Sequence, residues 1–536
     1  MFTKATGLVL FLLLSGSAVG QNTQSAISNE IRIKVESGRS IPFSSGAVVC
    51  CKTSVSQFYF SRLFATVWDQ SLASELIQVI DDCKYEGLNP DDYHLELLKT
   101  LFIKEDKTII EEAEYELLLT DSFLLLATHM MSGKVDPTSI DSNWKVIRRE
   151  GDPTNVLEQA LMSRKVKEHL YNLRPKYKTY TRLMEKLSLY LYIMENGGWG
   201  MVDDGPALKK GMQDDRILSV RKRLKLTGDI GSYTIEDPDI FDDQLEEAIK
   251  KFQKRHGLAV DGTIGKGTLE AFNVSVEQRV RDIKINLERC RWLPQDLGEN
   301  YIMVNIPAFE MEVVQRGDVM IEMDVAVGKP YRETPVFSSK MIYLVFNPYW
   351  TVPPTILAND IIPAQIKNPD YLKNTRIKVI TGSGSEIDPT TIDWKAINPK
   401  QFPYQLRQEP GPNNALGEVK FIFPNQFNVY MHDTNHRALF TKSDRALSSG
   451  CIRLSKPSSL YHYLLVDNGN FTPERIAGIL KTQQNYTVPL TISMMVHLQY
   501  WTAFIDENGI LNFRKDVYSR NQRILNRLME KPPLKN

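Results

Sequence analysis

The spacing of hydrophobic residues changes close to residue 300, and this change constrains the fold of the 536-residue chain more than any other feature. Over residues 56–198 leucines recur at helical spacing, which predicts an α-helical domain at residues 46–200. From Tyr301 the sequence becomes strand-like, as in Ile302-Met303-Val304-Asn305-Ile306, which predicts a mostly β domain at residues 300–490. The chain is therefore expected to be a multidomain α+β protein.

Two shorter regions and a tail complete this organisation. Residues 207–274 contain an amphipathic helix and a glycine-containing turn before a second helix, which predicts a small helical domain. Residues 351–417 interrupt the β domain with prolines, aromatic residues and helical fragments, and insertions of this length are often lids over a binding site. Residues 491–536 are expected to form a C-terminal extension.

The first 20 residues have the layout of a secretory signal peptide. Lys4 precedes the apolar run Leu8-Val9-Leu10-Phe11-Leu12-Leu13-Leu14, and small residues follow up to Gly20. The run is shorter than the roughly 20 residues that span a bilayer, so a cleaved signal is favoured over a permanent anchor. With 65 basic and 65 acidic residues the formal charge is zero, which gives no reason to expect nucleic acid or an anionic membrane surface as a partner.

The chain has five cysteines, an odd number that leaves one thiol to explain in an exported protein. Cys451 is the candidate for that single thiol. Four others could pair in three ways or stay as buried thiols, and their spacing shows no zinc pattern: Cys50, Cys51, Cys83 and Cys290. We therefore expect neither a metal nor a cofactor.

Cys451 lies in a segment that is typical of a catalytic nucleophile, Ser448-Ser449-Gly450-Cys451-Ile452-Arg453-Leu454. A thiol needs an imidazole or a set of backbone N–H groups to favour its thiolate, and His432, 19 residues upstream, can be that base. Asn428-Val429-Tyr430-Met431-His432 is strand-like and would place His432 at a strand end. The alternative is a buried structural thiol beside a loop histidine. His436 competes as the base but lies in a polar loop.

The residues beside Cys451 have candidate roles too. The backbone N–H groups of Gly450 and Cys451 are candidates for an oxyanion hole, and Gly450 also removes side-chain bulk beside the sulfur. Ser449 either orients the site or bonds its own backbone as a turn hydroxyl. Arg453 would share the face of Cys451 on an extended segment, where it could hold a substrate carboxylate or form a structural ion pair.

Two aromatic residues stand where the insertion begins. Tyr349 and Trp350 precede Thr351 and could stack on a substrate, although core packing explains such residues equally well.

These motifs resemble the signature of the L,D-transpeptidases, which cross-link bacterial peptidoglycan. Many members carry Ser/Thr-His-Gly-Cys, whereas this chain has Ser449 at the histidine position, as in the large multidomain periplasmic branch. Supporting matches occur along the chain, among them Val345-Phe346-Asn347-Pro348-Tyr349-Trp350, Gln408-Glu409-Pro410-Gly411, Asn414-Ala415-Leu416-Gly417 and Tyr500-Trp501-Thr502-Ala503.

The resemblance implies a fold and an activity. It implies a helical scaffold domain, a peptidoglycan-binding-like domain that either binds glycan or braces the enzyme, and a catalytic domain with a substrate-capping insertion, all in the periplasm. Cys451 would form an acyl-enzyme with a tetrapeptide stem, releasing D-Ala, and the side-chain amine of a second stem would resolve it as a 3→3 cross-link. Carbapenem β-lactams would acylate the same sulfur.

Two other functions remain open at this point. Water in place of the acceptor amine would make the protein an L,D-carboxypeptidase. The third hypothesis is a noncatalytic scaffold that binds the cell wall. The presence of both Cys451 and His432 argues against it. The sequence does not indicate an oligomeric state.

Overall fold

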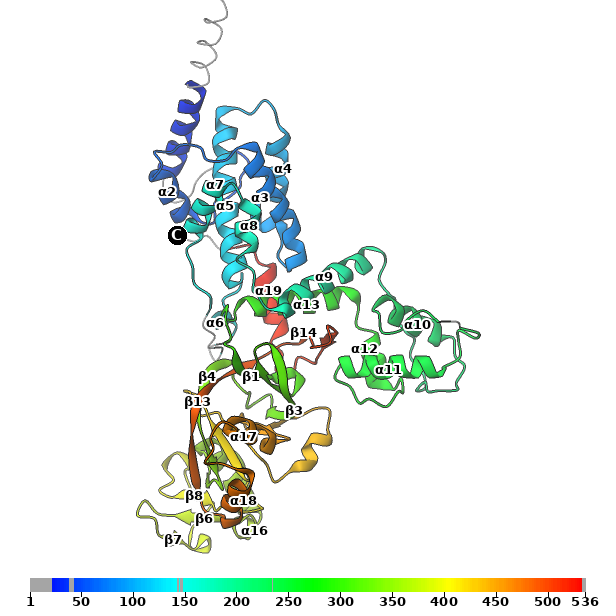
Figure 1. Cartoon of the computed structure of the whole chain (residues 1–536), viewed down its shortest axis with the longest axis vertical. Coiled ribbons are helices and arrows are strands. Elements are labelled where there is room, and N and C mark those ends of the chain that lie inside the picture. Colours follow the sequence, from blue (N-terminus) through cyan, green and yellow to red (C-terminus); the bar gives the residue numbers. More distant parts are fainter. Residues whose placement is uncertain (1–21, 38–42, 142–143, 145–147, 234, 533–536) are drawn as a thin grey trace, which may run out of the picture.

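The computed structural model describes residues 22–37, 43–141, 144, 148–233 and 235–532, so the signal peptide expected at residues 1–20 lies outside the described residues. Figure 1 shows an elongated molecule with the helical domain at one end, the β domain at the other, and the unit of α10 to α12 projecting from the side. Within the described ranges, no helix combines the length and the apolar character needed to cross a membrane.

The helical domain is built around α5 (Ile109–Ser132), which is buried along most of its length. Thr108 and Glu111 form a capping box at its start, and the helix ends before Gly133, whose φ is +84°. The surrounding helices are α2 (Lys52–Phe60), α3 (Gln70–Asp82), α4 (Leu95–Ile103), α7 (Pro153–Ser163) and α8 (Val166–Tyr171). Their buried residues form one core that runs from Ile27 to Leu170.

The helical domain is shorter at its C-terminal end than the expected range of 46–200. Helix α9 (Lys178–Glu195) packs instead against α13 (Val276–Arg291), and both contact the hairpin of β14 (Ala503–Ile505) and β15 (Leu511–Phe513). This second core draws on three separate parts of the chain. It forms the junction between the helical and β domains, since the short helix α6 (Pro137–Ile140) also leads into the core of the β domain.

The small three-helix unit consists of α10 (Arg216–Leu226), α11 (Asp243–Arg255) and α12 (Lys266–Phe272) around its own core. Phe252 is fully buried there and stacks on Phe272 with ring centroids 4.1 Å apart. The end of α11 lies against the C-terminal hairpin, because Arg514 donates a hydrogen bond to the Arg255 carbonyl at 3.0 Å and His256 stacks on Phe513. These contacts brace the unit against the β domain.

The β domain contains a nine-stranded sheet in the order β11-β3-β12-β10-β9-β4-β13-β1-β2. Strand β3 also pairs with β2, so the sheet curls back on itself. The strands are β1 (Asn300–Asn305), β2 (Glu310–Gln315), β3 (Asp318–Gly328), β4 (Phe337–Phe346), β9 (Val419–Ile422), β10 (Met431–His432), β11 (Ala446–Ser448), β12 (Ile452–Leu454) and β13 (Tyr486–Gln499). Helices α17 (Pro457–Leu465), α18 (Pro473–Thr482) and α19 (Asn521–Met529) contribute side chains to its core.

The structure corrects the boundary expected at residue 490. Strand β13 continues through that position to Gln499 and is central in the sheet, parallel to β1 and antiparallel to β4. Tyr500, Tyr518 and Ile524 then pack into the same core. The C-terminal 46 residues expected as an extension, as far as they are described, are therefore part of the β domain, because its core needs this strand and α19 to cover it.

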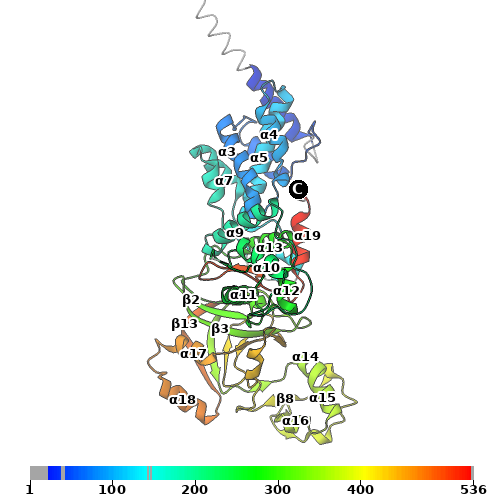
Figure 2. The same ribbon diagram turned by 90° about the vertical axis from the view of Figure 1, so that its right-hand side faces the viewer.

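The insertion in the β domain, which we call the capping subdomain (residues 350–414), has a sheet and a core of its own. Its strands β5 (Trp350–Thr351), β6 (Ile377–Ile380), β7 (Glu386–Ile387) and β8 (Gln405–Gln408) follow the order β5-β8-β6-β7. Its helices are α14 (Pro354–Ile356), α15 (Ile362–Lys367) and α16 (Tyr371–Asn374). Its separate core includes Leu372, Val379 and Leu406. Figure 2 shows this subdomain on the opposite side of the β domain from α17 and α18.

The expected multidomain α+β class is confirmed. A helical N-terminal region is followed by a largely β C-terminal domain, and the change in hydrophobic spacing near residue 300 marks the start of β1.

Candidate active site

Cys451 lies in a tight turn between the end of β11 and the start of β12. Gly450 adopts φ +113°, a region that favours glycine because it has no Cβ. The buried Ser448 hydroxyl donates to the Cys451 carbonyl at 2.6 Å and accepts the Gly450 N–H at 3.1 Å. The turn that carries the sulfur is therefore fixed by its own hydrogen bonds.

A second layer of hydrogen bonds holds this turn from behind. Thr334 donates its hydroxyl to the Gly450 carbonyl at 2.8 Å and accepts the Gly328 N–H at 2.9 Å. The Tyr518 hydroxyl donates to the Gly328 carbonyl at 2.7 Å and accepts the Thr334 N–H at 3.1 Å. A Cβ at Gly328 would lie 2.0 Å from the Arg332 carbonyl oxygen, so only glycine allows the loop to fold back this closely.

His432 reaches Cys451 through parallel pairing of β10 with β12. Met431 is opposite Ile452 and His432 is opposite Arg453, and this register closes the gap between the two motifs. His432 and Cys451 line the same pocket of about 350 Å³. His432 Nδ1 lies 2.5 Å from the Asp433 backbone oxygen. Because a carbonyl oxygen only accepts, Nδ1 carries the proton and Nε2 is left as the base.

The resting pair is neutral. Burial raises the pKa of the Cys451 thiol to about 11, against the opposing effects of the Tyr430 backbone and the Arg453 charge. Burial, with the Arg453 charge second, lowers the pKa of His432 to about 3. At neutral pH the site therefore holds a thiol and an unprotonated imidazole, which are a candidate nucleophile and a candidate base.

Three cationic or basic side chains lie in a row across the strands at this site. Lys420 is opposite His432 in β9, and His432 is opposite Arg453 in β12, so the three share one face of the sheet. Arg453 lines the pocket, and its Nε has no hydrogen-bond partner among the described residues. Burial lowers the pKa of Arg453 and of Lys420. A half-buried guanidinium without a carboxylate favours the substrate role of Arg453 over the structural ion pair.

The capping subdomain forms the other wall of the pocket. Trp350 lines it together with Pro353, Pro354 and Ile356. Tyr349, which we expected beside Trp350 as a substrate-stacking residue, does not line the pocket, and its ring lies 4.7 Å from the Arg407 guanidinium instead. The correction follows from the extended backbone, in which neighbouring side chains point to opposite faces.

Ser449 connects the two walls. It lines the pocket, and its hydroxyl accepts a hydrogen bond from Arg332 Nη1 at 2.9 Å. The same Nη1 lies 2.5 Å from Asp360 in the capping subdomain. Ser449 thus orients Arg332, and the expected alternative of a turn hydroxyl bonded to its own backbone is absent from the described hydrogen bonds.

The oxyanion hole differs from the expectation. The Gly450 N–H already donates to Ser448 Oγ, so it is not free to stabilise an oxyanion. Of the two expected donors only the Cys451 N–H remains, since it donates no hydrogen bond to another group in the described part of the chain. His436 is exposed and does not line the pocket, which leaves His432 as the candidate base.

Several residues of the site carried little signal in the sequence. Lys420 stands at the polar position of an alternating strand, which would have placed it on the face opposite the core. Tyr430 lines the pocket two residues before His432. Thr334, Tyr518 and Arg332 act only through contacts made by the fold. No group of three or more His, Cys, Asp or Glu within the described residues is arranged to hold a metal ion.

Comparison with known families gives three matches along the chain. Residues 53–187 match a model described as "Scaffold domain", residues 213–272 one described as "Putative peptidoglycan binding domain", and residues 299–476 one described as "L,D-transpeptidase catalytic domain". A curated relative from Haemophilus influenzae, named "Putative L,D-transpeptidase", is 36% identical over 242 residues, which are 45% of this chain and 48% of that protein. The match thus spans about half of the relative's length.

Solved structures that resemble this chain include an L,D-transpeptidase from Mycobacterium smegmatis, with 14% identity and a TM-score of 0.18 over 38% of this chain and 58% of that one. A crystal structure from Xylanimonas cellulosilytica has 13% identity and a TM-score of 0.19 over 55% and 99% of the two chains. A third, an LD transpeptidase in complex with imipenem, has 14% identity and a TM-score of 0.17 over 38% and 59%. These TM-scores are too low to carry an argument about this chain.

Proposed function

Since this chain carries the catalytic domain of the L,D-transpeptidase family, we propose that it is a peptidoglycan L,D-transpeptidase that forms 3→3 cross-links through a thioester on Cys451. The observation that carries the proposal is one pocket that holds a neutral thiol, an imidazole with Nε2 available and a guanidinium that forms no salt bridge with any of the described residues. These are a nucleophile, its base and an anchor for an anionic peptide.

The first half-reaction breaks the bond between the diamino acid of a tetrapeptide stem and its D-Ala. As the Cys451 sulfur attacks the carbonyl carbon, the thiol proton passes to His432 Nε2. The Cys451 N–H is the candidate donor to the oxyanion that develops. His432 then gives its proton to the departing D-Ala amine, and a thioester remains on Cys451.

The second half-reaction regenerates the thiol. The side-chain amine of a second stem attacks the thioester carbonyl, His432 takes a proton from that amine, and the proton returns to the sulfur as it leaves. An amide bond joins the two stems. Arg453 would hold a carboxylate of the donor stem beside the sulfur throughout, since it lines the same pocket as Cys451.

A carbapenem β-lactam would acylate the same Cys451 sulfur, because its ring carbonyl would meet the same nucleophile as the stem peptide. The three-helix unit would act chiefly as a brace, because α11 is held against the C-terminal hairpin by Arg514 and His256. We further propose export to the periplasm, with removal of residues 1–20. The N-terminal peptide of the secreted protein, identified by mass spectrometry, tests that proposal.

The deciding experiment is mass spectrometry of the products after incubation with a disaccharide-tetrapeptide. We expect a dimer lighter than two monomers by one D-Ala, and no such dimer with Cys451→Ala. Tripeptide without dimer would replace the proposal by L,D-carboxypeptidase activity. No reaction in a correctly folded wild-type protein would instead favour the noncatalytic scaffold.

A further inference from the structure

A small cavity, which we call the junction cavity, lies where the helical and β domains meet. It is bounded by the start of α9, the end of α13, strands β1 and β2, and the segment that leads into β14. Figure 1 shows these elements together in the middle of the molecule. Its volume is about 130 Å³, and cavities of about this size hold a molecule of roughly six heavy atoms. The junction cavity is therefore of a size for a small molecule.

The lining of the junction cavity is acidic and aromatic. Glu310 and Glu312 line it from β2, and none of the described residues that line it is a lysine, an arginine or a histidine. Aromatic rings flank an ammonium group favourably, because their faces carry partial negative charge. The aromatic residues of the lining are Tyr177, Tyr301, Trp501 and Phe504.

The two carboxylates differ in their partners. Glu310 pairs with Arg514 at 3.1 Å, whereas Glu312 forms no salt bridge with any described residue. Glu312 instead lies opposite Glu322 in the register of β2 with β3, and like charges directly opposite each other destabilise a sheet. A cation beside Glu312 would relieve this repulsion.

The wider surroundings of Glu312 are also acidic. Burial raises the pKa of Glu312 to about 7, and the neighbouring charges that act in the same direction are all carboxylates. After Glu322 and Glu310 these are Glu507 and Asp506, in the loop of the β14–β15 hairpin. The carboxylate thus lacks the counter-charge that a buried acid normally has.

Three polar groups of the lining have no hydrogen-bond partner among the described residues: Asn305 Nδ2, Trp501 Nε1 and the Tyr177 hydroxyl. Asn305 is only 7% exposed, and its Oδ1 accepts the Trp501 backbone N–H at 3.0 Å, which leaves Nδ2 unused. Asn305 shares a face of β1 with Tyr301 and Met303, which also line the cavity. Buried donors without a partner are costly, so an accepting oxygen in the cavity would stabilise them.

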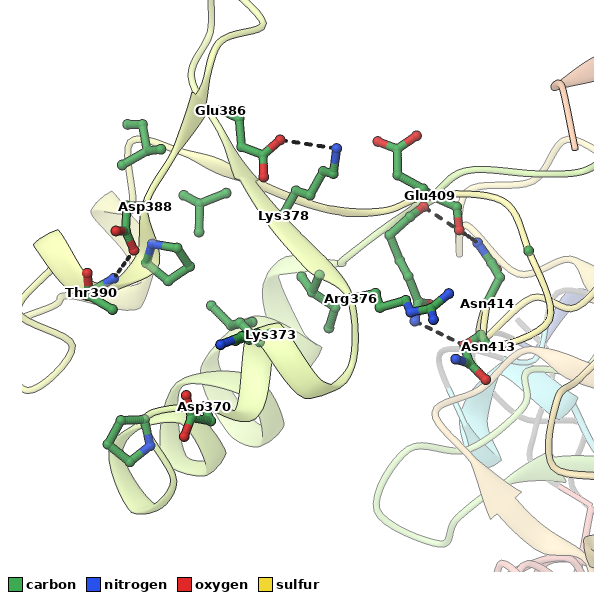
Figure 3. Close-up of a pocket in the computed structure, with 18 of the residues that line it drawn as sticks. Asp370, Lys373, Arg376, Lys378, Glu386, Asp388, Thr390, Glu409, Asn413 and Asn414 are labelled. Atoms are coloured by element: carbon green, nitrogen blue, oxygen red, sulfur yellow. Dashed lines mark hydrogen bonds and ion pairs between the residues drawn. The ribbon is translucent and has the colours of Figure 1, made fainter.

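The cavity of about 450 Å³ in the capping subdomain differs from the junction cavity in its charge. Figure 3 shows Lys378 joined to Glu386, with further side chains of both signs along the lining, among them Lys373, Arg376 and Asp370. Because its acidic and basic residues offset one another, that cavity favours neither an anion nor a cation. The junction cavity has no such balance.

We propose that the junction cavity binds a small primary amine that carries a hydrogen-bond-accepting oxygen close to its ammonium group. The ammonium group pairs with Glu312 among the aromatic rings, and the oxygen accepts hydrogen bonds from Asn305 and Trp501. No residue lines both this cavity and the pocket of Cys451, so the site is separate from the catalytic one. Because the amine contacts α13 and the sheet together, it holds the helical junction against the β domain.

Calorimetric titration of the full chain with glycinamide tests the proposal, since this probe has an ammonium group and a carbonyl oxygen on five heavy atoms. We expect a dissociation constant of about 1 mM or lower. Glycolamide has a hydroxyl in place of the ammonium group and should bind roughly ten-fold or more weakly, because it cannot form the charge-assisted hydrogen bond. Propylammonium lacks the oxygen and should bind about two- to ten-fold more weakly than glycinamide.

Glu312→Gln should remove the preference for glycinamide over glycolamide. The variant should fold at least as stably as the wild type without ligand, because it removes a carboxylate from an acidic cluster, and thermal unfolding measures this. The matched control is Glu322→Gln, which removes the carboxylate directly opposite. Because Glu322 is exposed and does not line the cavity, this control should keep the preference.

Trp501→Phe keeps an aromatic ring and removes the Nε1 donor. It should weaken the binding of glycinamide and leave that of propylammonium unchanged, which places the ligand oxygen at Trp501. Equal affinity of the wild type for glycinamide and glycolamide would overturn the inference. Glycinamide binding that Glu312→Gln does not weaken, or no binding of glycinamide to the wild type, would overturn it as well.

Discussion

The two walls of the catalytic pocket are built in different ways. The sheet wall carries His432 on β10 and Cys451 in the turn before β12, and the apolar faces of these strands belong to the large core of the β domain. The capping wall carries Trp350 and Ile356 and rests on a small core of its own. Buried hydrogen bonds join the sheet wall to distant parts of the chain. The capping wall, in contrast, contacts the sheet wall through a few polar side chains.

The contacts that hold the sheet wall in place and those that join the two walls differ in burial as well as in number. Behind the nucleophile, Thr334 is fully buried and Tyr518 is 4% exposed, so their hydrogen bonds are shielded from water. Between the walls, the Arg332–Asp360 pair has side chains that are 14% and 42% exposed. Hydrogen bonds that are shielded from water fix the geometry of the groups they join, and losing one costs much stability. Exposed ion pairs contribute little to stability. We therefore expect the sheet wall to control the rate of chemistry and the capping wall to control substrate binding.

The largest expected effect follows from removing the base on the sheet wall. His432→Ala should slow acylation of Cys451 by about 10²–10⁴-fold, the usual contribution of a general base. The rate of adduct formation with a carbapenem, followed by mass spectrometry, measures it. His436→Ala is the matched control and should keep the wild-type rate, because His436 is exposed and outside the pocket. Equal loss in both variants would contradict the assignment of the base.

The pH dependence tests whether that wall holds a neutral pair. With the pKa of His432 near 3 and that of Cys451 near 11, the imidazole stays unprotonated and the thiol protonated from pH 5 to pH 8. The acylation rate should therefore be flat over this range. A base with the ordinary pKa of 6.5 would lose about thirty-fold of its rate at pH 5. An acylation rate that falls as the pH drops below about 6.5 would show that Cys451 and His432 are not buried as described.

The free energy of unfolding should also depend on pH because the pKa of His432 is lowered in the folded protein. The unfolded chain binds a proton at His432 below pH 6.5, whereas the folded protein does so only near pH 3. The contribution of this residue to the free energy of unfolding is therefore complete above pH 6.5 and declines as the pH falls toward 3.

Removing one of the shielded hydrogen bonds should have an intermediate effect. Tyr518→Phe leaves the buried Gly328 carbonyl and the Thr334 N–H without their partner, which costs about 1–3 kcal/mol of stability. Because Tyr518 positions the turn and does not line the pocket, kcat should fall by roughly ten-fold while KM stays the same. Thermal unfolding and steady-state rates measure the two effects.

Tyr463→Phe provides the control for the hydroxyl, since Tyr463 is only partly buried and its side chain makes no hydrogen bond within the described residues. A larger loss in KM than in kcat for Tyr518→Phe would place its role in binding rather than in positioning.

The same contrast explains what the sequence could predict. The change from helical to strand-like spacing is local, and so are the turn at Gly450 and the strand that ends at His432. These local patterns predicted the α+β class, and they also predicted a candidate nucleophile and a candidate base, which the structure brings into one pocket. The supports of the turn are not local. Thr334 lies 116 residues from Gly450, and Tyr518 lies 190 residues from Gly328, so no pattern along the chain joins them.

Other expectations failed for reasons of geometry. Gly450 has the predicted backbone freedom, but its N–H is used by Ser448, which only coordinates reveal. Tyr349 was paired with Trp350 by proximity in sequence, although neighbours on an extended segment face opposite sides. The boundary at residue 490 cut a strand whose apolar residues resume after the irregular stretch between Pro489 and Met494.

The smallest effect is expected at the contact between the two walls. Arg332→Gln and Asp360→Asn should each raise the substrate KM two- to five-fold, since a partly exposed ion pair contributes about 0.2–1 kcal/mol. Arg332→Gln also removes the hydrogen bond to Ser449, so it should be the more damaging of the two. In a double-mutant cycle the pair should show a coupling of the same small size in KM and none in the acylation rate constant at saturation. Coupling in the acylation rate would mean that the capping wall acts on the nucleophile itself, through Ser449, and the two walls would no longer be separate in function.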